Sequence, residues 1–206
     1  MDIITIILLA LVLVISIGFH EYAHALVSYK LWDPTPKLQW RLTPNPLKHL
    51  DPIGFLMIFL IHFGWWKPVQ VDPSYYKNKL RDELLVALAG PFANFLMAFI
   101  WWALLVLFAK FNQVNPLIYQ FFQLFIFINL ALAIFNLLPI YPLDWYRIIK
   151  FLKPSWAYFM EQHALYFSIF LLILVFMPWN LIWNIINTIV SPIESLILFI
   201  WTSLLF

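Results

Sequence analysis

Long apolar runs, separated by short polar segments, make up most of the chain. The first run is uncharged from residue 3 to residue 19 and continues past one polar island to residue 29. Because it lacks the basic head of a cleavable signal peptide, we expect it to be retained as a membrane span. Four further long runs follow at 84–109, 116–138, 156–177 and 179–206. A helix needs about 20 apolar residues to cross a bilayer, so the pattern predicts an all-α, multi-pass membrane protein with about five transmembrane helices.

A shorter apolar run, 53–66, lies between the first two long ones. Its 14 residues would form a helix of about 21 Å, whereas the hydrocarbon core is about 30 Å thick. We therefore expect a re-entrant or interfacial segment. The surrounding region, 31–80, contains seven prolines, which exclude a long helix. Together with strand-like pieces such as 37–41, they predict short β-hairpin-like elements on the cytoplasmic side.

The basic residues indicate the topology, because lysine and arginine concentrate in cytoplasmic loops. If the 53–66 run does not cross the membrane, eleven of the twelve basic residues lie on one side and only Lys110 lies on the other. If it crosses, the division becomes five and seven. The first arrangement agrees with the positive-inside rule, so we expect the N-terminus outside.

The composition limits the classes of partner. Hydrophobic residues make up 64% of the 206 residues and charged residues 11%, whereas a soluble domain is about half apolar and a quarter charged. The net charge of +2 provides no basic field that would attract nucleic acid. The lipid bilayer is the expected partner. Without an internal repeat or a linker, we expect one membrane-embedded domain over 1–206, with a core over about 1–150 and a C-terminal helical pair over about 155–206.

The polar island in the first span contains His20, Glu21 and His24. Residues four apart lie on one face of a helix, so both imidazoles can bind one ion while Glu21 reaches a water beside it. This is the HExxH pattern of zinc enzymes, with two metal ligands and a general base. Ionisable groups inside a span are costly and usually functional. The pattern therefore favours a metal site over two histidines that only bond to neighbouring helices.

A catalytic zinc ion has three protein ligands and one open position, and a chain without cysteine must supply the third from His, Asp or Glu. The candidate is Asp144, where a span ends at Pro139 and Pro142. In the preferred topology Asp144 lies on the same side as the histidines. His20 is ten residues before Lys30, about 15 Å along a helix, so the site is expected nearer the cytoplasmic face.

Other assignments stay open at this point. Asp144 could instead cap a helix or pair with Arg147, and Glu161 and His163 are rival ligands in the next span.

Four further polar residues have two interpretations each. His49 and His62 could be ligands or regulators, although a lone histidine near an interface is usually a satisfied polar residue. Asn94 and Asn136, amides within apolar runs, could bind an extended substrate or the developing oxyanion, or could hold helices together. We list them as substrate-binding candidates.

Three ordered motifs carry a family resemblance. They are His20-Glu21-xx-His24, Gly90-Pro91-Phe-Ala-Asn94 and Asn136-xx-Pro139-xxx-Leu143-Asp144. The chain resembles the site-2 protease family of intramembrane zinc metalloproteases, peptidase family M50, in its short bacterial and archaeal form without a PDZ domain. The resemblance implies one Zn²⁺ bound by His20, His24 and Asp144, with Glu21 as the catalytic base. This sequence departs from the family at Trp145, where the family usually has glycine. A bulky side chain there is expected to affect the geometry of the site and the rate of reaction more than metal binding.

The expected function is zinc-dependent hydrolysis of peptide bonds within or near transmembrane segments of other proteins, in a prokaryotic cell membrane. An unwound substrate could pair with the strand-like piece 37–41 by β-addition. One alternative is a catalytically silent relative that binds membrane helices without cutting them. Another is a metal transporter, which is expected to show a symmetry-related repeat that this sequence lacks.

Overall fold

The structure, a computed structural model, describes residues 2–61, 64–111, 113–176 and 179–205. Within these ranges the protein is all-α, as predicted, and no residue belongs to a β-strand. Strand-like pairing there is limited to one isolated antiparallel bridge between Leu50 and Trp66.

The prediction of strand-like pieces is therefore wrong. Residues 35–38 of the proline-rich region form the short helix α2 (Thr35–Leu38), which begins after Pro34 and has Pro36 in its first turn. A proline ring holds φ near −65° and suits the first turn of a helix. The alternating polarity of 37–41 had suggested a strand, but the prolines before it favour a helical turn.

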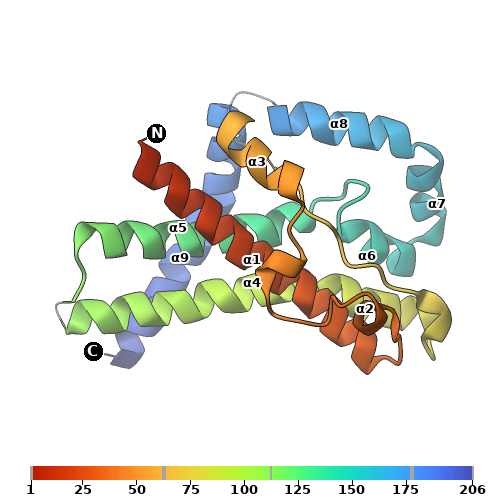
Figure 1. Ribbon diagram of the computed structural model, residues 1–206, viewed down its shortest axis with the longest axis horizontal. Helices are drawn as coiled ribbons and strands as arrows, with labels where there is room; N and C mark the ends of the chain where they lie inside the picture. Colours follow the sequence, from red (N-terminus) through yellow and green to blue (C-terminus); the bar gives the residue numbers. More distant parts are fainter. Residues whose placement is uncertain (1, 62–63, 112, 177–178, 206) are drawn as a thin grey trace.

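Four long helices form the frame of the molecule (Figure 1). They are α1 (Ile3–Lys30), α4 (Lys79–Lys110), α5 (Pro116–Asn136) and α9 (Trp179–Leu205). In the described part of the chain, these are the helices long and apolar enough to cross a membrane individually. The side chains of Asp2, Asn78 and Asn115 cap the first three, each accepting a hydrogen bond from a backbone N–H of the first turn.

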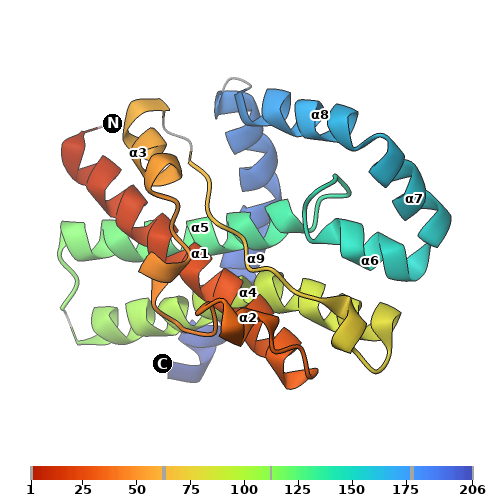
Figure 2. The same cartoon turned by 45° about the vertical axis from the view of Figure 1, so that its right-hand side comes forward.

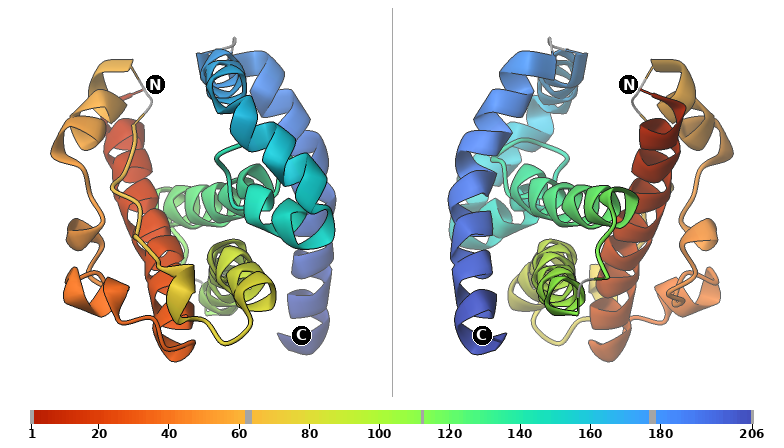
Figure 3. Two further views of the ribbon diagram at one scale, coloured as in Figure 1. Left: turned by 90° about the vertical axis from the view of Figure 1, so that its right-hand side faces the viewer. Right: turned by 90° about the vertical axis from the view of Figure 1, so that its left-hand side faces the viewer.

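Helices α4 and α5 run side by side, and Figure 3 shows them end-on between α1 and α9. Apolar side chains fill the contact between α4, α5 and α9. The buried members of this core are Ala98, Trp102, Leu105, Val106, Phe122, Ile126, Leu130, Val190 and Ile197. The core lies beside the site described below and fixes the position of α4 and α5 relative to each other.

The apolar run at 156–177 is not one straight helix. It forms α7 (Pro154–Gln162) and α8 (Ala164–Phe176), and the described part of this pair is bent by 79° at His163. The break follows the polar pair Glu161 and Gln162, which interrupts the apolar sequence. The described residues therefore contain four candidate spans, or five if the bent pair counts as one.

The two ends of the short apolar run at 53–66 lie close together. It contains α3 (Pro52–Ile61), whose ten residues span about 15 Å. The bridge between Leu50 and Trp66 joins the two ends of the segment, and Gly54 packs directly on the backbone of Trp65. Figure 2 shows α3 beside the extended chain that returns from it. His62 lies outside the described residues.

Three short helices complete the layers around α1 and α4. They are η1 (Pro46–Lys48), η2 (Pro73–Tyr75) and α6 (Trp145–Leu152). Helix η1 packs on α1 at Gly18, where an added Cβ would overlap Pro46, so glycine permits this close approach.

Candidate metal centre

Helix α1 places both histidines of the HExxH motif on one face. One helical turn separates His20 from His24, and their Nε2 atoms lie 3.0 Å apart. Both side chains are buried, as is Glu21. The spacing therefore produces the shared face that the sequence predicted.

Asp144 lies beside the two histidines, although it is 120 residues from His24 along the chain. Its Oδ2 atom is 3.2 Å from His20 Nε2, and its Oδ1 atom is 3.3 Å from His24 Nε2. Zinc bonds to nitrogen and oxygen are about 2.0–2.1 Å, so neighbouring ligand atoms in a tetrahedral site lie about 3.3 Å apart. The three side chains thus have the chemistry and the spacing of three corners of a zinc site.

The other interpretations of Asp144 gain no support from the described contacts. Its carboxylate makes no capping hydrogen bond to α6, and no ion pair to Arg147 occurs among the described side chains. The rival ligands have other partners: Glu161 accepts a hydrogen bond from Tyr146 Oη, and His163 Nδ1 bonds to the Phe159 carbonyl.

Hydrogen bonds from behind orient both imidazoles. His20 Nδ1 lies 2.7 Å from Asn94 Oδ1, and His24 Nδ1 lies 2.7 Å from the Val86 carbonyl oxygen. Both partners are acceptors, so each Nδ1 carries the proton and each Nε2 presents a lone pair to the centre. Such bonds fix the tautomer and the orientation that a metal ligand needs.

The Asn94 amide belongs to a buried chain of hydrogen bonds between helices. Its Nδ2 donates to Asn129 Oδ1 at 3.1 Å, and Asn129 Nδ2 donates to Ser16 Oγ at 2.8 Å. This chain links α4, α5 and α1 behind His20. The sequence analysis missed Asn129 and Ser16, although an asparagine within an apolar run was a signal of the same kind as Asn94.

Gly90 allows α4 to approach the two histidines closely. A Cβ at this position would lie 2.6 Å from His20 Nε2 and would also overlap the His24 ring. Contacts below 3.0 Å require atoms to shift, and the ring atoms involved are the ones that would bind metal. Gly90 therefore packs directly against the two candidate ligands.

We predict that Gly90→Ala lowers zinc occupancy. Alanine is the better helix former by about 1 kcal/mol, so any loss comes from displaced imidazoles and not from a weaker helix. Metal analysis of the purified protein measures the effect. Ala109→Gly, at the exposed far end of α4, is the control and should keep its zinc. Full zinc occupancy in Gly90→Ala would show that the site tolerates the added methyl group.

Glu21 is held by the extended chain that returns from α3. The backbone N–H of Val69 donates to Glu21 Oε2 at 2.8 Å. The buried guanidinium of Arg41 secures this chain by donating to the carbonyl oxygens of Lys48 and Lys67. The Glu21 carboxylate therefore has one oxygen oriented by a backbone hydrogen bond.

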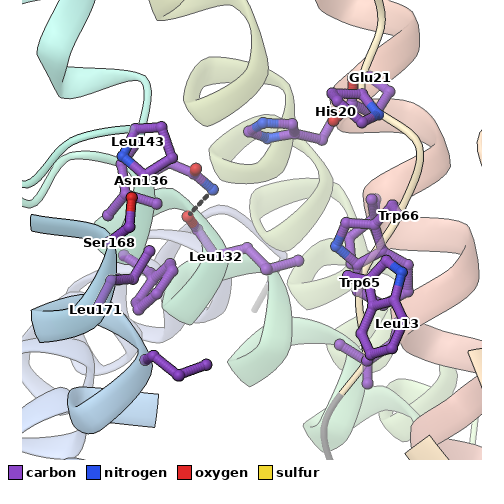
Figure 4. A pocket seen from close by; sticks show the side chains of 16 residues that line it. Leu13, His20, Glu21, Trp65, Trp66, Leu132, Asn136, Leu143, Ser168 and Leu171 are labelled. Atoms are coloured by element: carbon purple, nitrogen blue, oxygen red, sulfur yellow. Dashed lines mark hydrogen bonds between the residues drawn. The ribbon is translucent and has the colours of Figure 1, made fainter. Parts of the chain in front are cut away.

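A cavity of about 540 Å³ opens beside this centre (Figure 4). Its walls come from α1, the chain 64–68, the end of α5 with the loop after it, and α8. The lining residues are Leu13, Ile17, His20, Glu21, Gly64, Trp65, Trp66, Pro68, Leu132, Phe135, Asn136, Pro142, Leu143, Ser168, Leu171 and Leu172. An apolar cleft of this size with a few polar groups at one end has the character of a ligand-binding site.

The two asparagines have different positions relative to this cavity. Asn136 lines it, and its Nδ2 donates to the Leu132 carbonyl at 3.0 Å. Asn94 is not among the lining residues and is buried behind His20. The structure therefore brings Asn136 to the cleft and uses Asn94 to hold a candidate ligand.

Neither His49 nor Trp145 belongs to the three-ligand cluster. The Nε2 atom of buried His49 is 3.0 Å from the Thr43 carbonyl oxygen, and burial lowers the pKa of this imidazole. Trp145 is the first residue of α6, and its φ angle is not positive. A glycine is therefore not required there for backbone conformation, and Trp145 is not among the cavity-lining residues.

Comparison with known proteins agrees with this geometry. The sequence profile of peptidase family M50 matches residues 8–120. The chain belongs to peptidase family M50. The match covers the HExxH motif and Asn94 of this M50 protein but ends before Asp144, so the geometry above carries the assignment of the third ligand.

Similar M50 sequences come from bacteria and archaea. Bacillus subtilis YwhC, a candidate zinc metalloprotease by name, is 41% identical over 187 residues, covering 87% of this chain and 85% of the relative. MJ0611 of Methanocaldococcus jannaschii, named in the same way, is 30% identical over 73% of this chain and 75% of its own. Mycobacterium tuberculosis Rip2 is 27% identical over 80% of this chain and 64% of its own. No solved structure matches the chain.

Proposed function

We propose that this M50 protein is a zinc-dependent intramembrane endopeptidase. The observation that carries the proposal is the cluster of His20, His24 and Asp144, with its spacing of 3.0–3.3 Å, beside Glu21 in an apolar cleft. The relatives named as candidate zinc metalloproteases support both the metal and the reaction. The candidate membrane spans support a location of this chemistry within a bilayer.

The side chains divide the work of peptide hydrolysis between them. The Nε2 atoms of His20 and His24 and the carboxylate of Asp144 would hold the ion, and a zinc ion bound there would supply a lowered pKa for water and polarisation of a carbonyl. Glu21 takes the proton of the attacking water and gives it to the leaving amine. The Val69 N–H keeps the Glu21 carboxylate turned toward the cleft throughout.

The proposed substrate is a transmembrane helix of another protein. The cleft is lined mainly by apolar side chains from α1, α5 and α8, which suits a membrane segment. A helical peptide bond is shielded and hydrogen-bonded, so the substrate must unwind locally before it is cut. The extended chain 64–68 forms one wall and replaces 37–41 as the candidate for pairing with the unwound strand. Asn136 is the amide positioned to bind it.

The proposed topology has the N-terminus outside and the centre nearer the cytoplasmic face. The out-and-back course of 50–66 supports a re-entrant segment that does not cross. The positive-inside count then applies with eleven of twelve basic residues on the cytoplasmic side. His20 lies about 15 Å along α1 from the basic end at Lys30.

The test is direct cleavage of membrane peptides. The purified, zinc-loaded protein is incubated with a panel of transmembrane peptides and with soluble peptides, and the products are mapped by mass spectrometry. We expect cuts within transmembrane segments that stop on chelation and resume when zinc is returned. Zinc binding without cleavage of any peptide would favour the silent relative, and zinc flux into vesicles without cleavage would favour the transporter.

A further inference from the structure

A second groove lies at the end of α1, away from the metal centre. It has a volume of about 820 Å³. It is lined by Tyr29, Pro34, Lys37, Leu38, Trp40, Leu42, Thr43 and Lys48. None of these residues lines the catalytic cleft, and the proposed hydrolysis does not use them.

The rim of this groove exposes large apolar side chains. Among the side chains that line it, Trp40 is 81% exposed and Leu38 is 73% exposed. A contiguous patch of large, exposed apolar side chains is rare on a surface that contacts only water. Tryptophan beside lysine is typical of the boundary between lipid and water.

The charges exposed around the groove are positive. Between residues 30 and 50 the only acid is Asp33, which is fully buried and accepts hydrogen bonds from Ser28 Oγ and the Thr35 N–H. Arg41 is buried as well, with its guanidinium directed at backbone carbonyls. The exposed charged side chains of this stretch are Lys30, Lys37 and Lys48. An anion approaching the groove therefore meets lysines with no carboxylate of this stretch between them.

The groove lies at the basic end of α1, which would extend past the hydrocarbon core if this helix spans a bilayer. Helix α1 has 28 residues and a length of about 42 Å, which exceeds the hydrocarbon core of about 30 Å. Its last residue, Lys30, is next to the groove. The Lys37 amine is already directed along the groove wall, 5.4 Å from the centre of the Tyr29 ring and 3.4 Å from its hydroxyl.

We propose that this groove binds the phosphate-containing headgroup of an anionic phospholipid. The amines of Lys37 and Lys48 and the hydroxyl of Thr43 face the phosphate, and the acyl chains lie against Leu38 and Trp40. A zwitterionic lipid carries its own ammonium group, which the lysines repel, so the site selects lipids with net negative charge.

The test uses the full-length protein in neutral detergent. Equal amounts of phosphatidylglycerol and phosphatidylcholine are added, and the lipids that stay bound are counted by native mass spectrometry. We expect preferential retention of phosphatidylglycerol, reduced about 30-fold in the double variant Lys37→Gln/Lys48→Gln. Lys37→Arg/Lys48→Arg should retain it, because the charge remains. Lys153→Gln, an exposed lysine elsewhere, is the matched control and should behave as wild type.

Three results would overturn the proposal. One is equal retention of the two lipids by the wild type. A second is unchanged phosphatidylglycerol retention in the glutamine double variant, whose folding is checked by its zinc content. The third is displacement of the lipid by an equal concentration of inorganic phosphate, which would make this a site for the free anion. Because the readout is bound lipid, the result does not depend on peptide cleavage.

Discussion

Glu21→Gln is expected to lower the rate of peptide cleavage by about 10³-fold while zinc stays bound. General acid–base catalysis contributes about 10²- to 10⁴-fold, and an amide cannot take a proton from water at neutral pH. The metal stays because glutamine replaces no ligand of the three-residue cluster. Steady-state cleavage of a transmembrane peptide and metal analysis of the same preparation measure the two effects together.

The control for this prediction is Glu161→Gln. It makes the same chemical change at an exposed residue that bonds to Tyr146 and is not part of the metal cluster. It should cleave at the wild-type rate. Equal cleavage by wild type and Glu21→Gln would contradict the role of Glu21 as the base. Loss of zinc from Glu21→Gln would mean that this carboxylate supports the metal site instead.

Asp144→Asn is expected to remove both zinc and activity. The two carboxylate oxygens of Asp144 lie 3.2 Å from His20 Nε2 and 3.3 Å from His24 Nε2. The amide keeps the shape of this carboxylate but loses its charge and replaces one of the two oxygens with nitrogen. Losing a hydrogen bond that only supports a ligand costs about 10- to 100-fold in metal affinity, so losing the ligand itself should cost more. Zinc titration of the metal-free protein measures the affinity directly.

Asp2→Asn is the matched control for Asp144→Asn. Asp2 caps α1 by accepting a hydrogen bond from the Thr5 N–H at 2.7 Å, and asparagine is an equally good cap. This variant should bind zinc as tightly as the wild type. If Asp144→Asn also bound zinc with wild-type affinity, the third ligand would have to be sought elsewhere.

Much of the candidate site could be predicted because it depends on one helix. The i, i+4 spacing of His20 and His24 determines their common face wherever α1 lies. Likewise, the lengths of the apolar runs were enough to predict α1, α4 and α5. The apolar run at 156–177 could be recognised from its length, but its bend of 79° could not, because run length does not report a bend. The alternation in 37–41 misled because it covers too few residues to outweigh two prolines.

The sequence by itself determined an all-α chain with helices apolar enough to cross a membrane, and a two-histidine metal motif with an adjacent glutamate. Only the tertiary structure decided which acid joins the histidines, that Asn94 holds His20 through a chain reaching Ser16, and that the Val69 N–H orients Glu21. The physical reason is the range of the interactions. The spacing of residues and the length of an apolar run report on local structure within one helix. These contacts instead join residues 48 to 124 positions apart, which meet only when the helices pack.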